Sequence, residues 1–181
     1  ADYHAEIPLK FIVSYEEYDL AIEGRADGII YEEGLLEETS RFLEDPRMDL
    51  EEGQEEAKPF VMIDEIKGVY LDVEQMAEPN AVHLAQAKCY AFIFATQHAL
   101  PAIGVQMTYC NLDTEEIRRF QMHYSYDEIE AWFLELVASY KKWSDFLFHH
   151  KMIRQQSIRG LEFPYAYRQG QKKLVTDVYR S

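Results

Sequence analysis

The sequence lacks the features of a membrane or secreted protein. It contains no run of about 18 consecutive apolar residues, the length that a membrane-spanning helix needs. Its first residues, "ADYHAEIPL", carry neither the basic start nor the apolar block of a signal peptide. We therefore expect a chain that makes no contact with a membrane and lies in the cytoplasm.

Cysteine is also scarce, because only Cys89 and Cys110 are present and each lies in an apolar run. This setting is typical of buried thiols in a reducing compartment and not of a disulfide framework. Two thiols cannot supply a four-cysteine zinc or iron–sulfur site. The phosphate-binding pattern G-x-x-x-x-G-K-[ST] is absent as well, so we expect no productive ATP binding by this chain alone.

Basic residues are outnumbered in the chain as a whole. The 181 residues hold 18 Lys and Arg against 33 Asp and Glu, a net charge of −15, which argues against a generic basic nucleic-acid binder. The charge is uneven, since Glu32 to Glu56 holds eleven acids and two arginines, whereas Tyr140 to Ser181 holds nine Lys and Arg and three acids. The acidic run is interpreted as a solvated loop or helix face, or as a partner-binding segment.

Apolar residues make up 48% of the chain, which is enough for a hydrophobic core. Strands grouped with two substantial helices, without an internal repeat, predict an α/β domain with a mixed sheet. Asn80 is a candidate N-cap for the second predicted helix. The predicted strands are Lys10–Tyr18, Leu20–Tyr31, Val61–Asp72, Ile103–Leu112 and Ile117–Tyr124, and the first two predicted helices are about Leu35–Leu43 and Val82–Leu100.

A long helix is predicted to begin at Ser125, because Ser125 and Glu128 have the spacing of a capping box. Apolar residues then recur at helical spacing, which predicts that one face of the helix packs on the body of the domain. This apolar stripe consists of Ile129, Trp132, Phe133, Leu136, Val137, Tyr140, Trp143 and Leu147.

The segment "VMIDEIKGVYLD" raises the question of function, since an apolar strand carries three charges close together. Residues two apart on a strand share a face, so Glu65 and Lys67 project together while Asp64 and Ile66 face the other side. A shift of one residue in register would exchange the roles of Asp64 and Glu65. Asp27 lies in "GRADGII", where glycines permit a close approach of the backbone. An Asp near Glu65 is costly unless a cation lies between them, and such hard oxygen ligands suit Mg²⁺ or Mn²⁺.

The helix after this strand carries a polar line along one face. His83, Gln86 and Tyr90 follow the spacing i, i+3 and i+7, which places three polar-tipped side chains on one side of the helix. Groups of this kind can hydrogen-bond a phosphate backbone or hold a neighbouring ligand.

Taken in order, these residues resemble the PD-(D/E)XK nucleases, and in particular the RecB-like exonuclease branch, over roughly Glu6 to Tyr126. The resemblance implies a restriction-endonuclease-like fold, a mixed central sheet flanked by helices. It also implies that Asp27, Glu65 and the main-chain carbonyl of Ile66 bind the divalent metal ion. Lys67 would position or activate the attacking water.

The same resemblance assigns Gln86 and Tyr90 to the branch's characteristic helix pair near the metal site and the DNA, with His83 on the same helix face. Glu6 matches an acidic position often seen on the first strand of the branch. Relatives usually have an earlier helix whose His or Glu completes metal binding, and we expect that this upstream piece is missing from the chain. The cysteine-ligated cluster of some relatives has no counterpart.

The C-terminal segment "SIRGLEFPYAYRQGQKKLVTDVYRS" is basic and aromatic. It resembles the start of superfamily 2 helicases of the DinG/XPD type, in which the glutamine of "R-x-G-Q" precedes the nucleotide-binding loop. We therefore predict a nuclease domain at residues 1–150 and, at residues 151–181, a linker and the start of a helicase domain. A basic DNA-contacting or disordered tail is the alternative.

The function predicted by these resemblances is that of a metal-dependent deoxyribonuclease. It would be an exonuclease acting on single-stranded DNA or DNA ends, in repair or recombination, beside a fused or associated DinG/XPD-like helicase. A catalytically inactive nuclease-fold module that binds DNA and feeds it to the helicase is the alternative. A third possibility is a protein-interaction domain built around the acidic run.

Each site residue also has a plainer interpretation. Glu65 and Lys67 can be a solvated strand pair, and Asp27 beside a glycine can be only a turn former. His83 can be an ordinary surface or half-buried histidine. Tyr90 can be a core residue, in a sequence that has 13 tyrosines to place.

Overall fold

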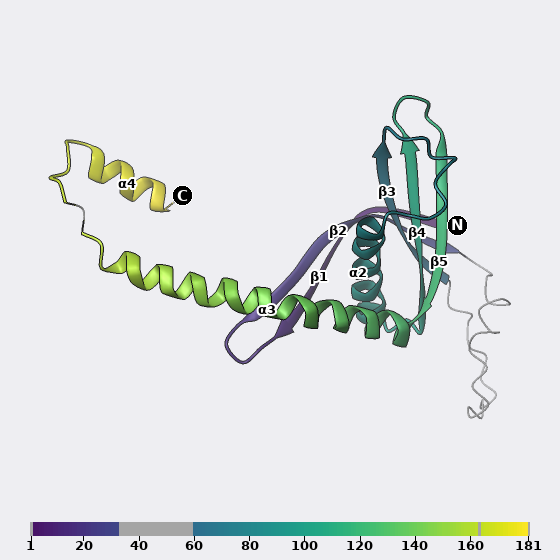
Figure 1. Ribbon diagram of the computed structural model, residues 1–181, viewed down its shortest axis with the longest axis horizontal. Coiled ribbons are helices and arrows are strands. Elements are labelled where there is room, and N and C mark those ends of the chain that lie inside the picture. The colour runs from purple at the N-terminus through teal and green to yellow at the C-terminus, as the bar shows by residue number, and fades with distance from the viewer. Residues whose placement is uncertain (1, 33–59, 163, 181) are drawn as a thin grey trace. The chain divides into compact units, whose positions relative to one another are not determined.

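The computed structural model describes residues 2–32, 60–162 and 164–180, in two units, Ala1–Tyr140 and Lys141–Ser181 (Figure 1). The helix predicted at Leu35–Leu43 and nearly all of the acidic run lie outside the described residues. The elements in chain order are β1 (Asp2–Ser14), β2 (Asp19–Glu32), β3 (Phe60–Val69), α2 (Ala81–His98), β4 (Ala102–Asn111), β5 (Ile117–Ser125), α3 (Tyr126–Arg159) and α4 (Gln171–Arg180).

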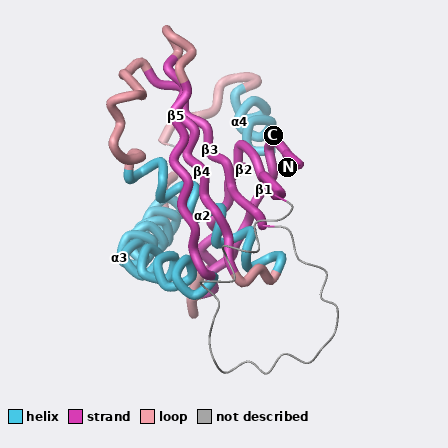
Figure 2. The backbone as a smooth tube through the Cα atoms, turned by 90° about the vertical axis from the view of Figure 1, so that its right-hand side faces the viewer, coloured by secondary structure: helices cyan, strands magenta, loops and turns pink. Residues whose placement is uncertain are grey.

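The first unit is built on one mixed sheet of five strands, which confirms the predicted α/β class. The strands lie side by side in the order β1-β2-β3-β4-β5 (Figure 2). Only β3 and β4 are parallel among these pairs, and the connection between them passes through α2, as a parallel pair requires. In the described segments no helix combines the length and the apolar character needed to cross a membrane.

Strands β1 and β2 correspond to the first two predicted strands and form an antiparallel hairpin, but β1 begins at Asp2, earlier than the predicted start at Lys10. Its first half contains Pro8, which has no backbone N–H to donate and therefore normally signals a break. Here β1 is an edge strand with β2 as its neighbour, and an edge strand tolerates proline. The pattern of the sequence alone does not show which strand lies at the edge.

Helix α2 packs on the sheet through small residues. Ala87, Ala91 and Ala95 are fully buried and follow the four-residue spacing of one helix face, which lets the helix approach the strands closely. The predicted N-cap is confirmed, because the Asn80 side chain accepts hydrogen bonds from the first-turn N–H groups of Val82 and His83. Helix α2 therefore begins at a fixed point, and it is the next element after β3, the strand that carries the charges.

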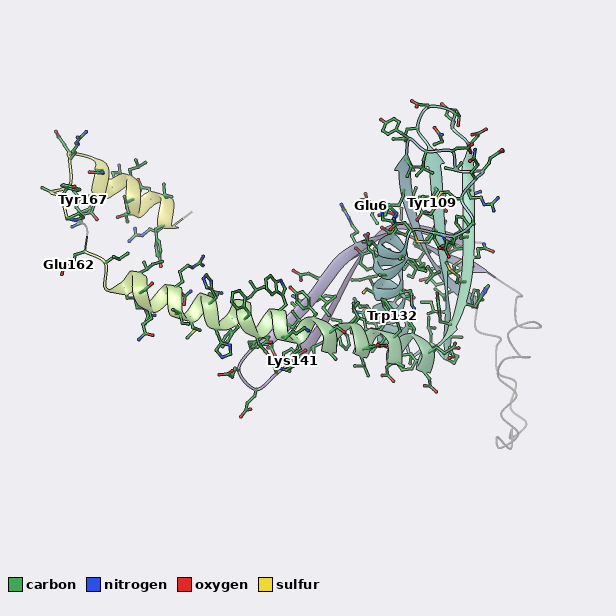
Figure 3. All side chains as sticks on the ribbon, viewed as in Figure 1. Glu6, Tyr109, Trp132, Lys141, Glu162 and Tyr167 are labelled. Carbon is green, nitrogen blue, oxygen red and sulfur yellow. The ribbon has the colours of Figure 1, made fainter. Side chains whose placement is uncertain are left out.

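Helix α3 begins as predicted, and half of its predicted stripe is wrong. Ile129, Phe133 and Val137 are buried, and Phe133 stacks on Phe92 of α2 with ring centroids 4.0 Å apart. Trp132, labelled in Figure 3, is on the same helix, and the ammonium group of Lys88 lies 4.1 Å from the centroid of its ring. The remaining members of the stripe are exposed, namely Leu136, Tyr140, Trp143 and Leu147. Helical spacing thus identified the apolar face of α3 but not which of its residues are buried by the rest of the protein.

The capping box at the start of α3 makes the stability of the protein depend on pH. The N–H and hydroxyl of Ser125 donate to the Glu128 carboxylate at 2.8 and 2.9 Å, and these bonds lower the pKa of Glu128. A depressed pKa gives stability that is present above the ordinary value of 4.5 and is lost as the pH falls through the folded value.

We therefore expect Glu128→Gln to lower the melting temperature at pH 7 and to lose this effect in acid. Thermal melts of both proteins from pH 7 to pH 3 measure the difference. Asp127→Asn, a neighbouring first-turn change outside the capping box, serves as the control. A wild-type advantage that stays constant over this pH range would contradict the assignment.

Candidate functional site

The charged strand β3 presents its side chains to two different environments. The register pairs Asp64 with Gly28 of β2 and with Gln106 of β4, and it pairs Lys67 with Tyr109 of β4. Because faces alternate along a strand, Glu65 and Lys67 share one side of the sheet, and Asp64 lies on the other. The predicted division of the charges between two faces is confirmed.

Glu65 and Lys67 form an ion pair that is largely removed from solvent. Lys67 Nζ donates to Glu65 Oε1, and the exposed fractions of the side chains are 24% for Lys67 and 1% for Glu65. The other carboxylate oxygen, Glu65 Oε2, is buried and has no hydrogen-bond partner among the described residues. The interpretation as a solvated strand pair is therefore wrong.

Burial raises the pKa of Glu65, and the charges of Asp27 and Asp64 raise that pKa further, while the hydrogen bond and charge of Lys67 oppose the shift. An unpaired buried carboxylate oxygen is costly, because desolvation is not repaid by a hydrogen bond. Two negative neighbours add to this cost. The surroundings of Glu65 are therefore suited to an additional positive charge.

Asp27 lies at the point where the ladder between β2 and β3 ends. The last register pair is Gly28 with Asp64, and beyond it the Asp27 carboxylate accepts the N–H of Ile66 at 2.8 Å. Asp27 therefore contacts the main chain of the residue between Glu65 and Lys67. The predicted set of Asp27, Glu65, Ile66 and Lys67 is brought together, and Asp27 is more than a turn former.

The backbone of β1 is distorted directly opposite Asp27. Ala5 pairs with Gly28 and Ile7 with Ala26, so Glu6 and Asp27 face each other without forming a ladder pair. Glu6 has a φ of 55°, a left-handed conformation that costs a non-glycine residue free energy and that is common at functional sites. The Glu6 side chain forms an exposed ion pair with Arg25 at 3.2 Å.

Asp64 is held in a buried polar network on the face opposite Glu65. Its Oδ1 accepts hydrogen bonds from Thr108 Oγ1 at 2.7 Å and from Gln106 Nε2 at 3.0 Å. Gln121 in turn donates to Gln106 Oε1 at 2.7 Å, so the network runs across β3, β4 and β5. Tyr3 of β1 also interacts with Asp64. Burial raises the pKa of Tyr3 most, and the negative charges of Asp64 and Asp27 raise this pKa further. Asp64 is thus a supporting residue, as its predicted orientation implies.

We expect Thr108→Val to destabilise the protein by about 1–3 kcal/mol, since it removes one hydrogen bond from a buried carboxylate and keeps the side-chain shape. Chemical denaturation followed by circular dichroism measures the free energy of unfolding. Thr176→Val is the matched control, because the Thr176 hydroxyl is exposed and bonds only within α4. Equal stability of Thr108→Val and the wild type would show that Gln106 and Tyr3, the other partners of Asp64, satisfy the carboxylate without Thr108.

The three residues of α2 that the sequence assigns to the site, His83, Gln86 and Tyr90, divide into two groups. Gln86 Nε2 donates to the Tyr90 hydroxyl at 3.2 Å, so this predicted pair is in direct contact. Tyr90 lies over Gly24 of β2, where a Cβ atom would be 2.4 Å from the Tyr90 hydroxyl oxygen. The absence of a side chain at Gly24 therefore makes room for Tyr90, which bridges α2 and the strand of Asp27.

His83 is separate from this pair and contacts β4. Its Nδ1 lies 3.2 Å from the hydroxyl of Tyr109, which also accepts the backbone N–H of Asn80 at 3.0 Å. Tyr109, labelled in Figure 3, belongs to β4. It is 1% exposed and is the register partner of Lys67. In the sequence Tyr109 is only one member of the predicted strand Ile103–Leu112, without an assigned role. The usable signal was its hydroxyl, since a buried tyrosine normally needs a hydrogen-bond partner.

The residues at the site fit a small, hard divalent ion. Two carboxylates and the main-chain carbonyl of Ile66 offer oxygen ligands, which Mg²⁺ and Mn²⁺ prefer. The partnerless, buried Glu65 Oε2 is the observation that favours a cation here. Within residues 2–32, 60–162 and 164–180, no group of three or more His, Cys, Asp and Glu side chains is arranged to hold a metal. Any ion would therefore need main-chain and water ligands.

Comparisons with known proteins add little to this picture. No protein-family model matches the chain, and no curated protein matches it. A solved structure described as "Crystal structure of SSO0001" is similar, with 19% sequence identity and a TM-score of 0.42. The match covers 70% of this chain and 44% of that chain, so this chain spans less than half of that protein's length. Similarity at this level carries no argument about function.

Proposed function

We propose that the protein is a divalent-metal-dependent DNA exonuclease that hydrolyses phosphodiester bonds of single-stranded DNA or DNA ends. One observation carries the proposal. Glu65 is buried with one carboxylate oxygen bound to Lys67, and its other oxygen has no partner in the part of the chain that the structure describes. Asp27 contacts the main chain between Glu65 and Lys67. An arrangement that is costly without a cation becomes favourable when a cation is present.

In this proposal Asp27, Glu65 and the Ile66 carbonyl hold Mg²⁺ or Mn²⁺. A divalent ion in such a site lowers the pKa of a bound water and polarises the scissile phosphate. Asp27 would have to exchange or share its hydrogen bond to the Ile66 N–H, since its carboxylate has a second oxygen. The raised pKa of Glu65 is the expected state of a metal ligand before the ion compensates its charge.

In this proposal Lys67 positions or activates the attacking water and stabilises the negative charge that develops on the phosphate. Its ammonium group is already oriented by Glu65 Oε1, so the flexible side chain is held beside the site. Because 24% of the side chain remains exposed, the group is accessible to a phosphate from solvent. Gln86, Tyr90 and His83 on α2 would contact the DNA backbone.

The cellular setting of the proposal is DNA repair or recombination in the cytoplasm, together with a fused or associated DinG/XPD-like helicase. Residues 1–150 would form the nuclease domain, and residues 151–181 the linker and the start of the helicase domain. Within the described residues both cysteines are free thiols, which is compatible with a reducing compartment.

The proposal is tested by incubating the protein with end-labelled single-stranded DNA and Mg²⁺ or Mn²⁺. We expect Lys67→Ala to reduce the rate by about a hundredfold or more, because a positioned charge at the reacting phosphate is lost. Lys10→Ala is the matched control, since Lys10 forms an exposed ion pair with Glu23 across β1 and β2 at 3.1 Å. Equal rates for Lys67→Ala and the wild type would rule out the assignment.

A second candidate function is a catalytically inactive nuclease-fold module that binds DNA and delivers it to the helicase. The hydrogen bond from the Ile66 N–H to Asp27 favours it, because this bond gives Asp27 a structural task that needs no metal. In this case DNA binding would weaken with salt and no hydrolysis would occur with either ion. Hydrolysis that is lost in Lys67→Ala and kept in Lys10→Ala would exclude this alternative.

A further inference from the structure

The hydroxyl of Tyr109 joins two elements next to the candidate site. It accepts the backbone N–H of Asn80, the N-cap of α2, at 3.0 Å and lies 3.2 Å from Nδ1 of His83 in the first turn of the same helix. The ring of Tyr109 is fully buried and stands beside Lys67 in the register of β3 and β4. Tyr109 therefore connects the strand next to the Glu65 and Lys67 pair with the start of α2.

Counting protons at this hydroxyl fixes the tautomer of His83. A tyrosine hydroxyl has one proton to donate, and the Asn80 N–H already donates to its oxygen. If His83 Nδ1 also donated, the buried hydroxyl proton would have no acceptor in the hydrogen bonds that the structure shows for Tyr109, which is costly. The economical arrangement is that Tyr109 donates to Nδ1, so the ring proton of neutral His83 lies on Nε2.

Two of the backbone N–H groups at the N-terminus of α2 are already occupied and are not free to bind an anion. The side-chain oxygen of Asn80 already accepts the N–H groups of Val82 and His83, which are the groups that would otherwise bind a phosphate. The half-buried His83 ring is therefore a side chain at this helix end that can offer a further donor. Its Nε2–H lies on the side of the ring opposite the bond to Tyr109.

We propose that Tyr109 is a positioning residue that holds His83 in the Nε2–H tautomer, so that His83 donates a hydrogen bond to a backbone phosphate of the DNA. The inference rests on the proposed function, because it takes DNA as the ligand. Tyr109 itself touches no substrate. It acts through His83, and its hydroxyl keeps a donor ready that would otherwise exchange between the two ring nitrogens.

The tautomer is tested directly by nitrogen NMR of the ¹⁵N-histidine-labelled protein without DNA or metal. The expected wild-type spectrum shows His83 with a protonated Nε2 and an unprotonated Nδ1. Tyr109→Phe should shift His83 towards a mixture of tautomers, whereas Tyr124→Phe, which keeps the ring under Lys88, should leave the spectrum unchanged. A wild-type His83 protonated on Nδ1 would overturn the inference.

The contribution to binding is tested by a double-mutant cycle. The affinity for a labelled single-stranded DNA is measured by fluorescence anisotropy in EDTA, so that hydrolysis plays no part. We expect His83→Ala to weaken binding roughly tenfold, which corresponds to the net contribution of about one hydrogen bond. Tyr109→Phe should weaken binding by a smaller factor, because only part of the His83 population then lacks the Nε2–H donor. The double variant should bind no more weakly than His83→Ala, because Tyr109 acts only through His83.

Two results would count against the inference. If the losses of DNA-binding free energy from the two substitutions added in the double variant, Tyr109 would act on the fold and not through His83. Thermal melts of each variant would then show a loss of stability in Tyr109→Phe. If His83→Ala bound DNA with unchanged affinity, the proposed hydrogen bond from His83 to a backbone phosphate would be ruled out. Neither result depends on cleavage, so a protein that binds DNA as expected but does not hydrolyse it would refute only the proposed nuclease activity.

Discussion

Replacing Glu65 with glutamine is expected to abolish metal-dependent DNA hydrolysis and at the same time to stabilise the metal-free protein. Glutamine keeps the size of the side chain and removes the negative charge. If Glu65 is a metal ligand as proposed, its loss should lower the rate by more than about a hundredfold, since such an ion would supply several kcal/mol to the transition state. Both effects come from the same oxygen atoms, so one variant reports on both.

The stabilising half of this prediction follows from the raised pKa of Glu65. A folded-state pKa above the ordinary value means that folding disfavours the ionised carboxylate at neutral pH. A neutral amide does not carry this cost, and we expect the melting temperature to rise by a few degrees. Active sites commonly trade stability for function in this way. The Lys67 ammonium left behind is partly exposed and can turn to solvent.

Thermal melts with and without Mn²⁺ measure both halves. The wild type should gain stability with Mn²⁺, because an ion that binds only the folded state shifts the equilibrium towards it, and Glu65→Gln should not respond. Glu23→Gln is the control, since Glu23 forms an exposed pair with Lys10. If Glu65→Gln responded to Mn²⁺ like the wild type, Glu65 would not be a ligand.

Replacing Asp27 with asparagine is expected to separate the two tasks of this residue. The amide oxygen can still accept the Ile66 N–H, so the free energy of unfolding should change by no more than about 1 kcal/mol. The negative charge on a proposed metal ligand is lost, so hydrolysis should fall by about a hundredfold or more. Urea denaturation and the DNA assay give the two values.

Asp27→Ala provides the comparison, because it removes both the charge and the acceptor. It should lose the same activity and, in addition, about 1–3 kcal/mol of stability through the unpaired N–H of Ile66. If Asp27→Asn remained fully active, the role of Asp27 would be the hydrogen bond alone. The inactive-module alternative would then be favoured over the nuclease.

Local patterns predicted much of the fold. Asn80 and the pair Ser125 and Glu128 were identified by type and spacing, and these caps are confirmed because capping depends on residues close in sequence. Helical periodicity overestimated the buried part of α3, because Leu136 is 39% exposed and Trp143 is 55% exposed. Periodicity reports which residues share a face, and the presence of a packing partner depends on distant parts of the chain.

The candidate site shows the same limit. Alternation on β3 correctly put Glu65 and Lys67 on one face, because it needs only the period of a strand. The partners of Asp64 come from another strand, 42 and 44 residues away at Gln106 and Thr108. Their contact depends on the register between β3 and β4, which single-strand patterns do not contain. Tyr109 was missed for the same reason.

The close fit of Tyr90 over Gly24 has a consequence for evolution. A Cβ atom at position 24 would overlap the Tyr90 ring, so the two positions constrain each other although 66 positions separate them in the chain. In homologous sequences we expect larger residues at 24 to occur more often with smaller residues at 90. Covariation of this pair would then trace the boundary of the lineages that keep the Gln86 and Tyr90 contact.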